Sequence, residues 1–126
     1  MTAKTPEQIK TAIAFTHLLN KIELLNQCVN ECEGSELERE CERIVYGICD
    51  DMDELIRTIN GRKFKMSVIK DFKAAYAKFG KKIKTLIDFT FGTEGSERQD
   101  GIGKYARSVK RAVPAFKQSL NDCEIM

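Results

Sequence analysis

Apolar residues recur every three or four positions along most of the chain, with polar residues between them. This spacing places the apolar side chains on one face of an α-helix, which completes a turn every 3.6 residues. It predicts three long helices over residues 6–33, 36–59 and 67–91, and a shorter fourth helix over residues 104–122. We therefore expect an all-α protein folded as a four-helix, largely up-down bundle.

Local signals mark the ends of the predicted helices. Thr5 and Gln8 form a capping-box pattern at the start of the first helix, and Ser35 and Glu38 repeat that pattern at the start of the second. Because Gly34 leaves room only for a tight turn between these two helices, we expect them to form an antiparallel hairpin.

The second half of the chain contains the strongest helix-breaking signals. Residues 92–103, GTEGSERQDGIG, include four glycines and show no apolar period, so they predict a flexible loop. Pro114 lacks a backbone N–H and is expected to kink the fourth helix. The tail at residues 122–126, DCEIM, is expected to fray. We see no internal repeat and no second domain, so residues 1–126 predict a single helical domain.

The charges are distributed unevenly along the chain, although its net charge is only +2. Residues 36–57 carry eight acidic and three basic side chains, whereas residues 62–84 carry nine basic side chains and one acidic side chain. The predicted second helix is therefore acidic and the predicted third helix basic, which is informative about partners in a way that the net charge is not.

Composition also bears on the location of the protein. The first residues lack the basic start and uninterrupted apolar run of a secretory signal, and no stretch approaches the roughly 20 apolar residues that cross a bilayer. Five cysteines, an odd number, favour free thiols over a disulfide framework. We expect a soluble cytoplasmic protein in a reducing compartment, with no membrane partner.

The clearest candidate surface is a basic one. On a helical projection, Lys70, Lys73, Lys81 and Lys84 lie opposite the apolar face of the predicted third helix. Arg107, Lys110 and Arg111 add positive charge on the fourth helix. A solvated helix face is the simplest interpretation, and a surface that follows a phosphate backbone without reading its sequence is the alternative.

The carboxylates of the second helix and the cysteines of the first hairpin are candidates for metal binding. Asp50 and Glu54 are spaced to share a hard cation on one helix face, which makes a metal-dependent enzyme a second alternative. In the expected hairpin Cys28 lies level with Cys41, and Cys32 lies one turn away. We interpret these thiols as small packing groups, with a zinc site or a disulfide between Cys28 and Cys41 as alternatives.

These observations favour a non-enzymatic interaction module that docks a protein partner, or a second copy of itself, through charged helical faces. We expect no cofactor and no resident metal. The apolar residues Met66, Phe89 and Phe91 lie at or beyond the edges of the predicted core face, and they are the candidate anchors of such a contact.

Overall fold

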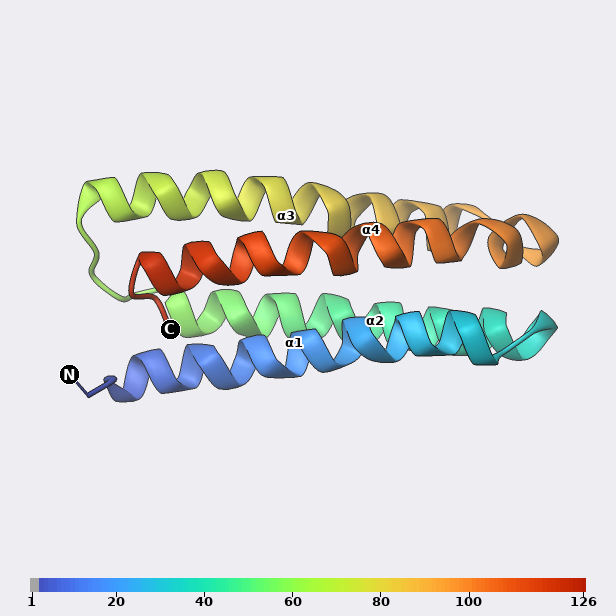
Figure 1. The fold of residues 1–126 in the computed structure, drawn as a ribbon, viewed down its shortest axis with the longest axis horizontal. Helices are drawn as coiled ribbons and strands as arrows, with labels where there is room; N and C mark the ends of the chain where they lie inside the picture. The colour runs from blue at the N-terminus through green and yellow to red at the C-terminus, as the bar shows by residue number, and fades with distance from the viewer. Residues whose placement is uncertain (1–2) are drawn as a thin grey trace.

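The computed structural model describes residues 3–126, which form four α-helices. The helices are α1 (Pro6–Glu31), α2 (Gly34–Ile59), α3 (Met66–Gly92) and α4 (Gly95–Asp122). Figure 1 shows two antiparallel hairpins, α1–α2 and α3–α4, stacked on one another with both hairpin turns at the same end. The predicted all-α, four-helix, up-down architecture is confirmed.

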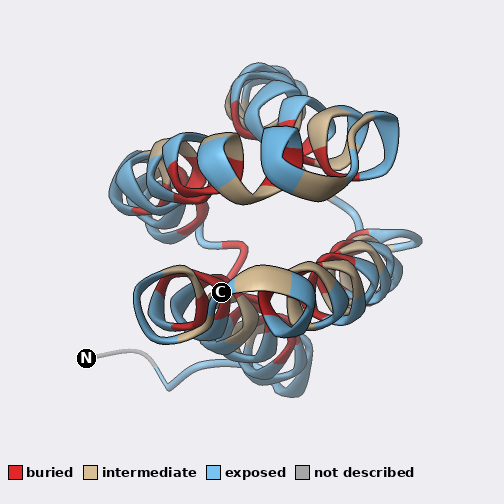
Figure 2. Ribbon diagram, turned by 90° about the vertical axis from the view of Figure 1, so that its right-hand side faces the viewer, coloured by how far each residue is buried: buried red, intermediate tan, exposed pale blue. Residues whose placement is uncertain are grey.

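The buried residues of the two hairpins face one another, so the core lies between the hairpins (Figure 2). All four helices contribute fully buried side chains at helical spacing, which confirms the apolar period of the sequence. The helix α3 buries four residues, half as many as each of the other helices. Consequently, a larger share of α3 faces solvent, and this share includes the side that borders α4.

The two predicted capping boxes differ in outcome. At α1 the Thr5 Oγ1 accepts a hydrogen bond from the Gln8 N–H at 3.2 Å, and the Gln8 Oε1 accepts one from the Thr5 N–H at 2.8 Å. At α2 the N-cap is Glu33, whose side chain makes no capping hydrogen bond, so the box predicted there is wrong. Glu38 instead accepts a hydrogen bond from the Gly95 N–H at 2.5 Å, which places its carboxylate at the start of α4.

Residues 95–103 are helical, so the flexible loop predicted over residues 92–103 is wrong. Two glycines that suggested flexibility instead permit close packing between elements. A Cβ on Gly101 would collide with the Phe89 ring of α3, and a Cβ on Gly103 would lie 3.0 Å from a methyl group of Val29. The helix α4 is therefore 28 residues long rather than shorter than the others.

A buried arginine hides the apolar period at the start of α4. Ile102 and Ala106 are fully buried, and the buried position one turn before them is Arg98. Its guanidinium donates to the Thr93 carbonyl oxygen at 2.6 and 3.0 Å and to the Glu42 carboxylate at 3.4 Å. These bonds satisfy the charge in the core and close the end of the α3–α4 hairpin.

The residues after α4 are ordered, so the predicted fraying of the tail is wrong. Ile125 and Met126 are buried at the end of the bundle. Arg62, from the connection between α2 and α3, donates to the Ile125 carbonyl oxygen at 2.8 Å and to the Thr11 Oγ1 at 2.9 Å. Gln8 Nε2 donates to the Glu124 carbonyl oxygen at 3.0 Å. The tail thus closes the end of the core opposite the two hairpin turns (Figure 1).

The two hairpins repeat one pattern, contrary to the expectation of no internal repeat. The turns at residues 33–36 and 94–97 share the sequence Glu-Gly-Ser-Glu, 61 positions apart. Gly34 and Gly95 adopt left-handed φ angles of 59° and 61°, which only glycine adopts without strain. A shift of 61 residues maps seven of the eight buried residues of α2 onto buried residues of α4, and the eighth, Ile44, onto the half-buried Tyr105.

Candidate functional site: a basic groove between helices α3 and α4

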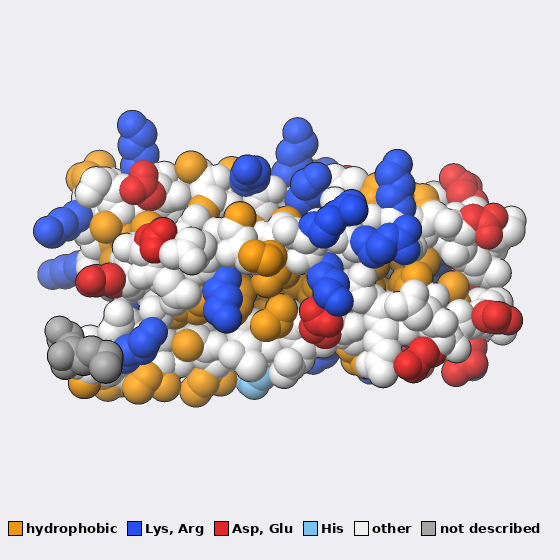
Figure 3. All heavy atoms as spheres, in the orientation of Figure 1, with side chains coloured by type: hydrophobic (Ala, Val, Ile, Leu, Met, Phe, Trp, Pro, Cys, Tyr) orange, Lys and Arg blue, Asp and Glu red, His pale blue; other side chains and the backbone are white. Residues whose placement is uncertain are grey.

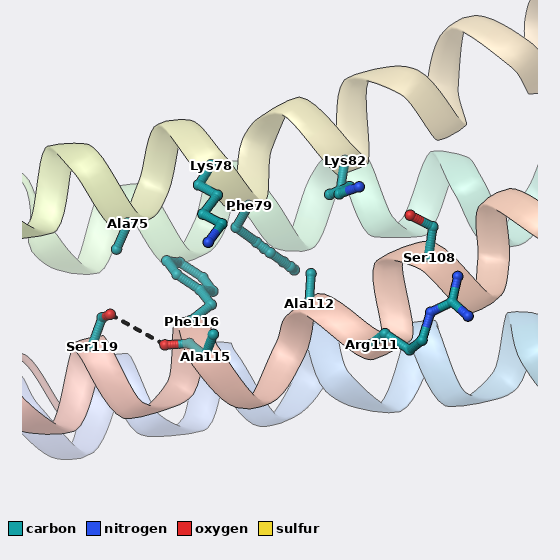
Figure 4. A pocket seen from close by; sticks show the side chains of 10 residues that line it. All are labelled: Ala75, Lys78, Phe79, Lys82, Ser108, Arg111, Ala112, Ala115, Phe116 and Ser119. Atoms are coloured by element: carbon teal, nitrogen blue, oxygen red, sulfur yellow. Dashed lines mark hydrogen bonds between the residues drawn. The ribbon is translucent and has the colours of Figure 1, made fainter.

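A groove follows the outer side of the seam between α3 and α4, and Figure 4 shows it from close by. It consists of two adjoining cavities with volumes of about 380 and 400 Å³. Phe79 and Phe116 form the floor, with their rings stacked at a centroid distance of 4.5 Å and an angle of 14°. Small side chains on both helices leave the space above these rings open: Ala75, Ser108, Ala112, Ala115 and Ser119.

Five cationic side chains surround this groove. Three come from α3 and two from α4, namely Lys78, Lys81, Lys82, Lys104 and Arg111. Among the described residues, neither cavity is lined by a carboxylate. Figure 3 shows lysine and arginine side chains gathered over these two helices. The arrangement creates a positive potential over an apolar floor, which is suited to an anionic ligand with apolar parts.

Two of the seven basic residues chosen from the sequence line the groove. Lys81 and Arg111 line the groove, whereas Lys70 and Lys73 are exposed outside its lining. The remaining three also lie outside it, and two of them are held in ion pairs. Lys84 Nζ lies 2.8 Å from the Asp88 carboxylate, and this hydrogen bond raises the pKa of Lys84. Lys110 Nζ lies 3.2 Å from the Glu23 carboxylate. The guanidinium of Arg107 lies over Gly103.

Sequence reasoning missed Lys78 and Lys82 as site residues. The helical projection selected lysines opposite the core, but a groove between two helices is lined by residues that flank the core face. Lys78 and Lys82 precede the buried residues Phe79 and Ile83 by one position each. The two lysines are four residues apart, as are the two buried residues that follow them, and this pattern could have identified the lysines from the sequence.

The three candidate apolar anchors have different surroundings. Met66 is 81% exposed at the start of α3. Phe91 is 39% exposed, and its ring lies 4.7 Å from that of Tyr46 on α2. Phe89 is half-buried and stacks on Tyr105 at 4.4 Å. Phe89 therefore packs within the bundle, while Met66 and Phe91 present apolar surface to solvent.

The carboxylates of α2 are dispersed rather than gathered around one point. Glu54 accepts a hydrogen bond from Arg57 at 2.9 Å, and the Asp51 carboxylate lies 3.7 Å from Lys21 Nζ. Asp50 and Asp53 are exposed. Within residues 3–126 there is no group of three or more His, Cys, Asp or Glu side chains placed to hold a metal ion.

The three cysteines of the first hairpin lie together, as their spacing predicted. Cys28 lies near the thiols of Cys32 and Cys41, and all five cysteines of the chain are free. Burial, with smaller contributions from the neighbouring thiols, raises the pKa of Cys28 to about 12, and burial raises the pKa of Cys41 to about 11. Both thiols are therefore protonated and weakly nucleophilic near neutral pH, which agrees with a packing role.

These raised pKa values predict a loss of stability at alkaline pH. The ordinary thiol pKa is 9.0, so the unfolded chain releases these protons before the folded chain does. The free energy of unfolding should fall above about pH 9, by at most about 1.4 kcal/mol per pH unit for each thiol. Guanidinium melts between pH 8 and 11 would measure this slope. A Cys28→Ala/Cys41→Ala variant should show a shallower slope, and parallel slopes would contradict the assignment.

Comparison with known protein families, with curated proteins and with solved structures found no match for this chain. No helix within residues 3–126 contains an apolar stretch that is long enough to span a membrane. The groove and the charges around it are thus the features on which a functional proposal rests.

Proposed function

We propose that this protein is a non-enzymatic interaction module that docks an acidic protein segment in the groove between α3 and α4. The observation that carries the proposal is the combination of five cationic side chains with an apolar floor in one groove. An amphipathic helix recognises such a groove by placing apolar side chains against the floor and acidic side chains against the rim. The opposite charges would also increase the association rate and orient the partner.

The apolar floor supports a protein partner over a nucleic acid. A phosphate backbone needs cations but gains nothing from apolar surface below them. Bases would need exposed aromatic rings for stacking, but Phe79 and Phe116 are each only 2% exposed. The apolar surface that stays accessible in the groove comes from Ala75, Ala112 and Ala115, which aliphatic side chains of a peptide can contact. Tyr105 is half-buried, stacks on Phe89 and has Lys104 Nζ 5.7 Å from its ring centroid. Sequence-nonspecific binding of nucleic acid is the alternative proposal, with Lys70 and Lys73 among its contacts.

Charge reversal with a matched control tests the proposal. The probes are two fluorescein-labelled helical peptides of equal negative charge, together with polyuridylate RNA. In the first peptide Glu and Leu lie four residues apart, and in the second Ser replaces each Leu. Fluorescence anisotropy should show that the Glu/Leu peptide binds at least tenfold more tightly than the Glu/Ser peptide. Lys78→Glu/Lys82→Glu should abolish this binding, whereas Lys70→Glu/Lys73→Glu, which changes the charge equally outside the groove, should preserve it.

Two results would contradict the proposal. Equal affinity for the two peptides would show that the apolar floor contributes nothing. RNA binding that is tighter than peptide binding and is lost in the Lys70→Glu/Lys73→Glu variant would favour nucleic acid. Circular dichroism of both variants verifies that they retain the helical fold.

A further inference from the structure

The internal repeat relates the groove to a place in the molecule where the corresponding space is occupied. A shift of 61 residues maps the seam between α1 and α2 onto the seam between α3 and α4. Under this shift Lys21 corresponds to Lys82, and Asp51 corresponds to Ala112. The first hairpin thus shows what the second hairpin lacks.

In the first hairpin a lysine and a carboxylate occupy the seam. The Lys21 side chain crosses α2 at Gly47, with its Cε 3.0 Å from the position that a Cβ on Gly47 would take. Its Nζ reaches to 3.7 Å from the Asp51 Oδ2. The side chain of Asp51 is 18% exposed and that of Lys21 is 38% exposed, so this ion pair covers the seam partly shielded from water.

In the second hairpin the corresponding lysine is present, but the position that corresponds to Asp51 carries no carboxylate. Lys82 is exposed and lines the groove beside Ala112, which has no polar side-chain atom (Figure 4). Ser108 takes the place of Gly47, so a side chain now stands where the lysine stem lies in the first hairpin. Lys82 lines an open space of about 380 Å³.

The substitutions around Ala112 remove negative charge in a consistent direction. Asp50 and Glu54, which flank Asp51 on α2, correspond to Arg111 and Ala115 on α4. Three carboxylates of the first hairpin are thereby replaced by one cation and two alanines that line the groove. The spacing of these carboxylates spans one turn of a helix, which is the spacing that a helical ligand would supply.

We propose that the groove binds a carboxylate of an acidic helical segment from another protein at Ala112, where Lys82 pairs with it as Lys21 pairs with Asp51. This inference rests on the proposed function and specifies its ligand. Charge complementarity selects the acidic helix, since the rim carries five cations and no carboxylate from the described residues. In a second copy of this chain the acidic helix is α2, and its apolar face is buried in its own core, so it cannot place apolar side chains in the groove; we therefore assign the site to a different protein.

Supplying the carboxylate within the chain tests this assignment. Ala112→Asp should pair with Lys82, fill the subsite and weaken binding of the Glu/Leu peptide at least tenfold. The matched control is Ala77→Asp, the same substitution at an exposed position of α3 outside the groove lining, which should weaken binding less than threefold. Lys82→Met should weaken binding at least tenfold, and adding Ala112→Asp to it should have little further effect because both changes act on one subsite.

Each outcome of this experiment decides the matter. If Ala112→Asp weakens binding no more than Ala77→Asp does, the carboxylate subsite is overturned, while the groove proposal stands on the Lys78→Glu/Lys82→Glu result. If the unmodified protein fails to bind the Glu/Leu peptide, both are overturned. Light scattering completes the test, since an oligomer that Ala112→Asp dissociates would make a second copy the occupant and would overturn the assignment to another protein.

Discussion

Replacing Phe116 by alanine is expected to destabilise the protein by about 3 to 5 kcal/mol, the usual cost of removing a buried aromatic side chain. Phe116 is 2% exposed, stacks on Phe79 of α3 and lies 6.1 Å from the ring of Phe15 on α1. It therefore connects three helices as well as forming the groove floor. Guanidinium denaturation, followed by the helical circular dichroism signal at about 222 nm, measures the change in the free energy of unfolding.

The matched variant for this prediction is Phe116→Leu, which keeps much of the buried volume. It should cost less than about 2 kcal/mol, because volume-conserving apolar substitutions are tolerated best. A cost below about 1 kcal/mol for Phe116→Ala would show that the rings at the groove floor contribute little to the packing. That result would also weaken the argument that the floor is a preformed apolar surface.

Replacing Ile125 by alanine is expected to cost about 2 to 5 kcal/mol, even though this residue lies in the last part of the chain. Ile125 is 1% exposed, and its carbonyl oxygen accepts the Arg62 hydrogen bond while its N–H donates to the Leu120 carbonyl oxygen at 2.9 Å. Removing the side chain should leave a cavity at the end of the core. The same denaturation experiment distinguishes this cost from the near-zero cost expected of a frayed tail.

Glu124→Gly provides the control in the opposite direction. Glu124 has a φ angle of 56°, the left-handed conformation that glycine adopts readily. Its side chain is exposed, so the glycine variant should be stable to within about 1 kcal/mol of the unmodified protein, or more stable. If both substitutions leave the unfolding midpoint unchanged, the tail does not close the core in solution.

The apolar period was sufficient to predict the four-helix fold and most of its core. In α2, for example, Ile44, Ile48 and Leu55 repeat at helical spacing, and all three are buried. The period failed at the start of α4 because Arg98 occupies a core position, where its charge is satisfied by the Thr93 carbonyl oxygen and Glu42. A prediction based on residue type alone places an arginine on the surface.

The glycines of α4 were misinterpreted for a related reason. Glycine weakens an isolated helix, so a glycine-rich segment suggests a loop. Gly101 and Gly103, however, lie where Phe89 and Val29 approach the α4 backbone closely. The packing that favours glycine at these positions depends on neighbouring helices, and a local sequence window contains no information about them.

The groove was only partly predictable from the sequence. Lys81 and Arg111 were chosen for their charge, but Lys82 was missed because its role depends on the space above Ala112. A projection of one helix shows which side faces the core, whereas a groove arises from two helices and from the small residues between them. Alignment of the two hairpin turns places Lys82 and Ala112 at the positions of Lys21 and Asp51.

The shared Glu-Gly-Ser-Glu turns also bear on how the chain reaches its folded state. Each turn joins two helices that pack against each other along their length, so the largest helix pairs consist of segments adjacent in sequence. Such a topology has a low contact order, and domains of this kind fold within microseconds to milliseconds. Each half can collapse locally before the connection at residues 60–65 brings the two halves together, which limits the lifetime of exposed apolar surface during synthesis.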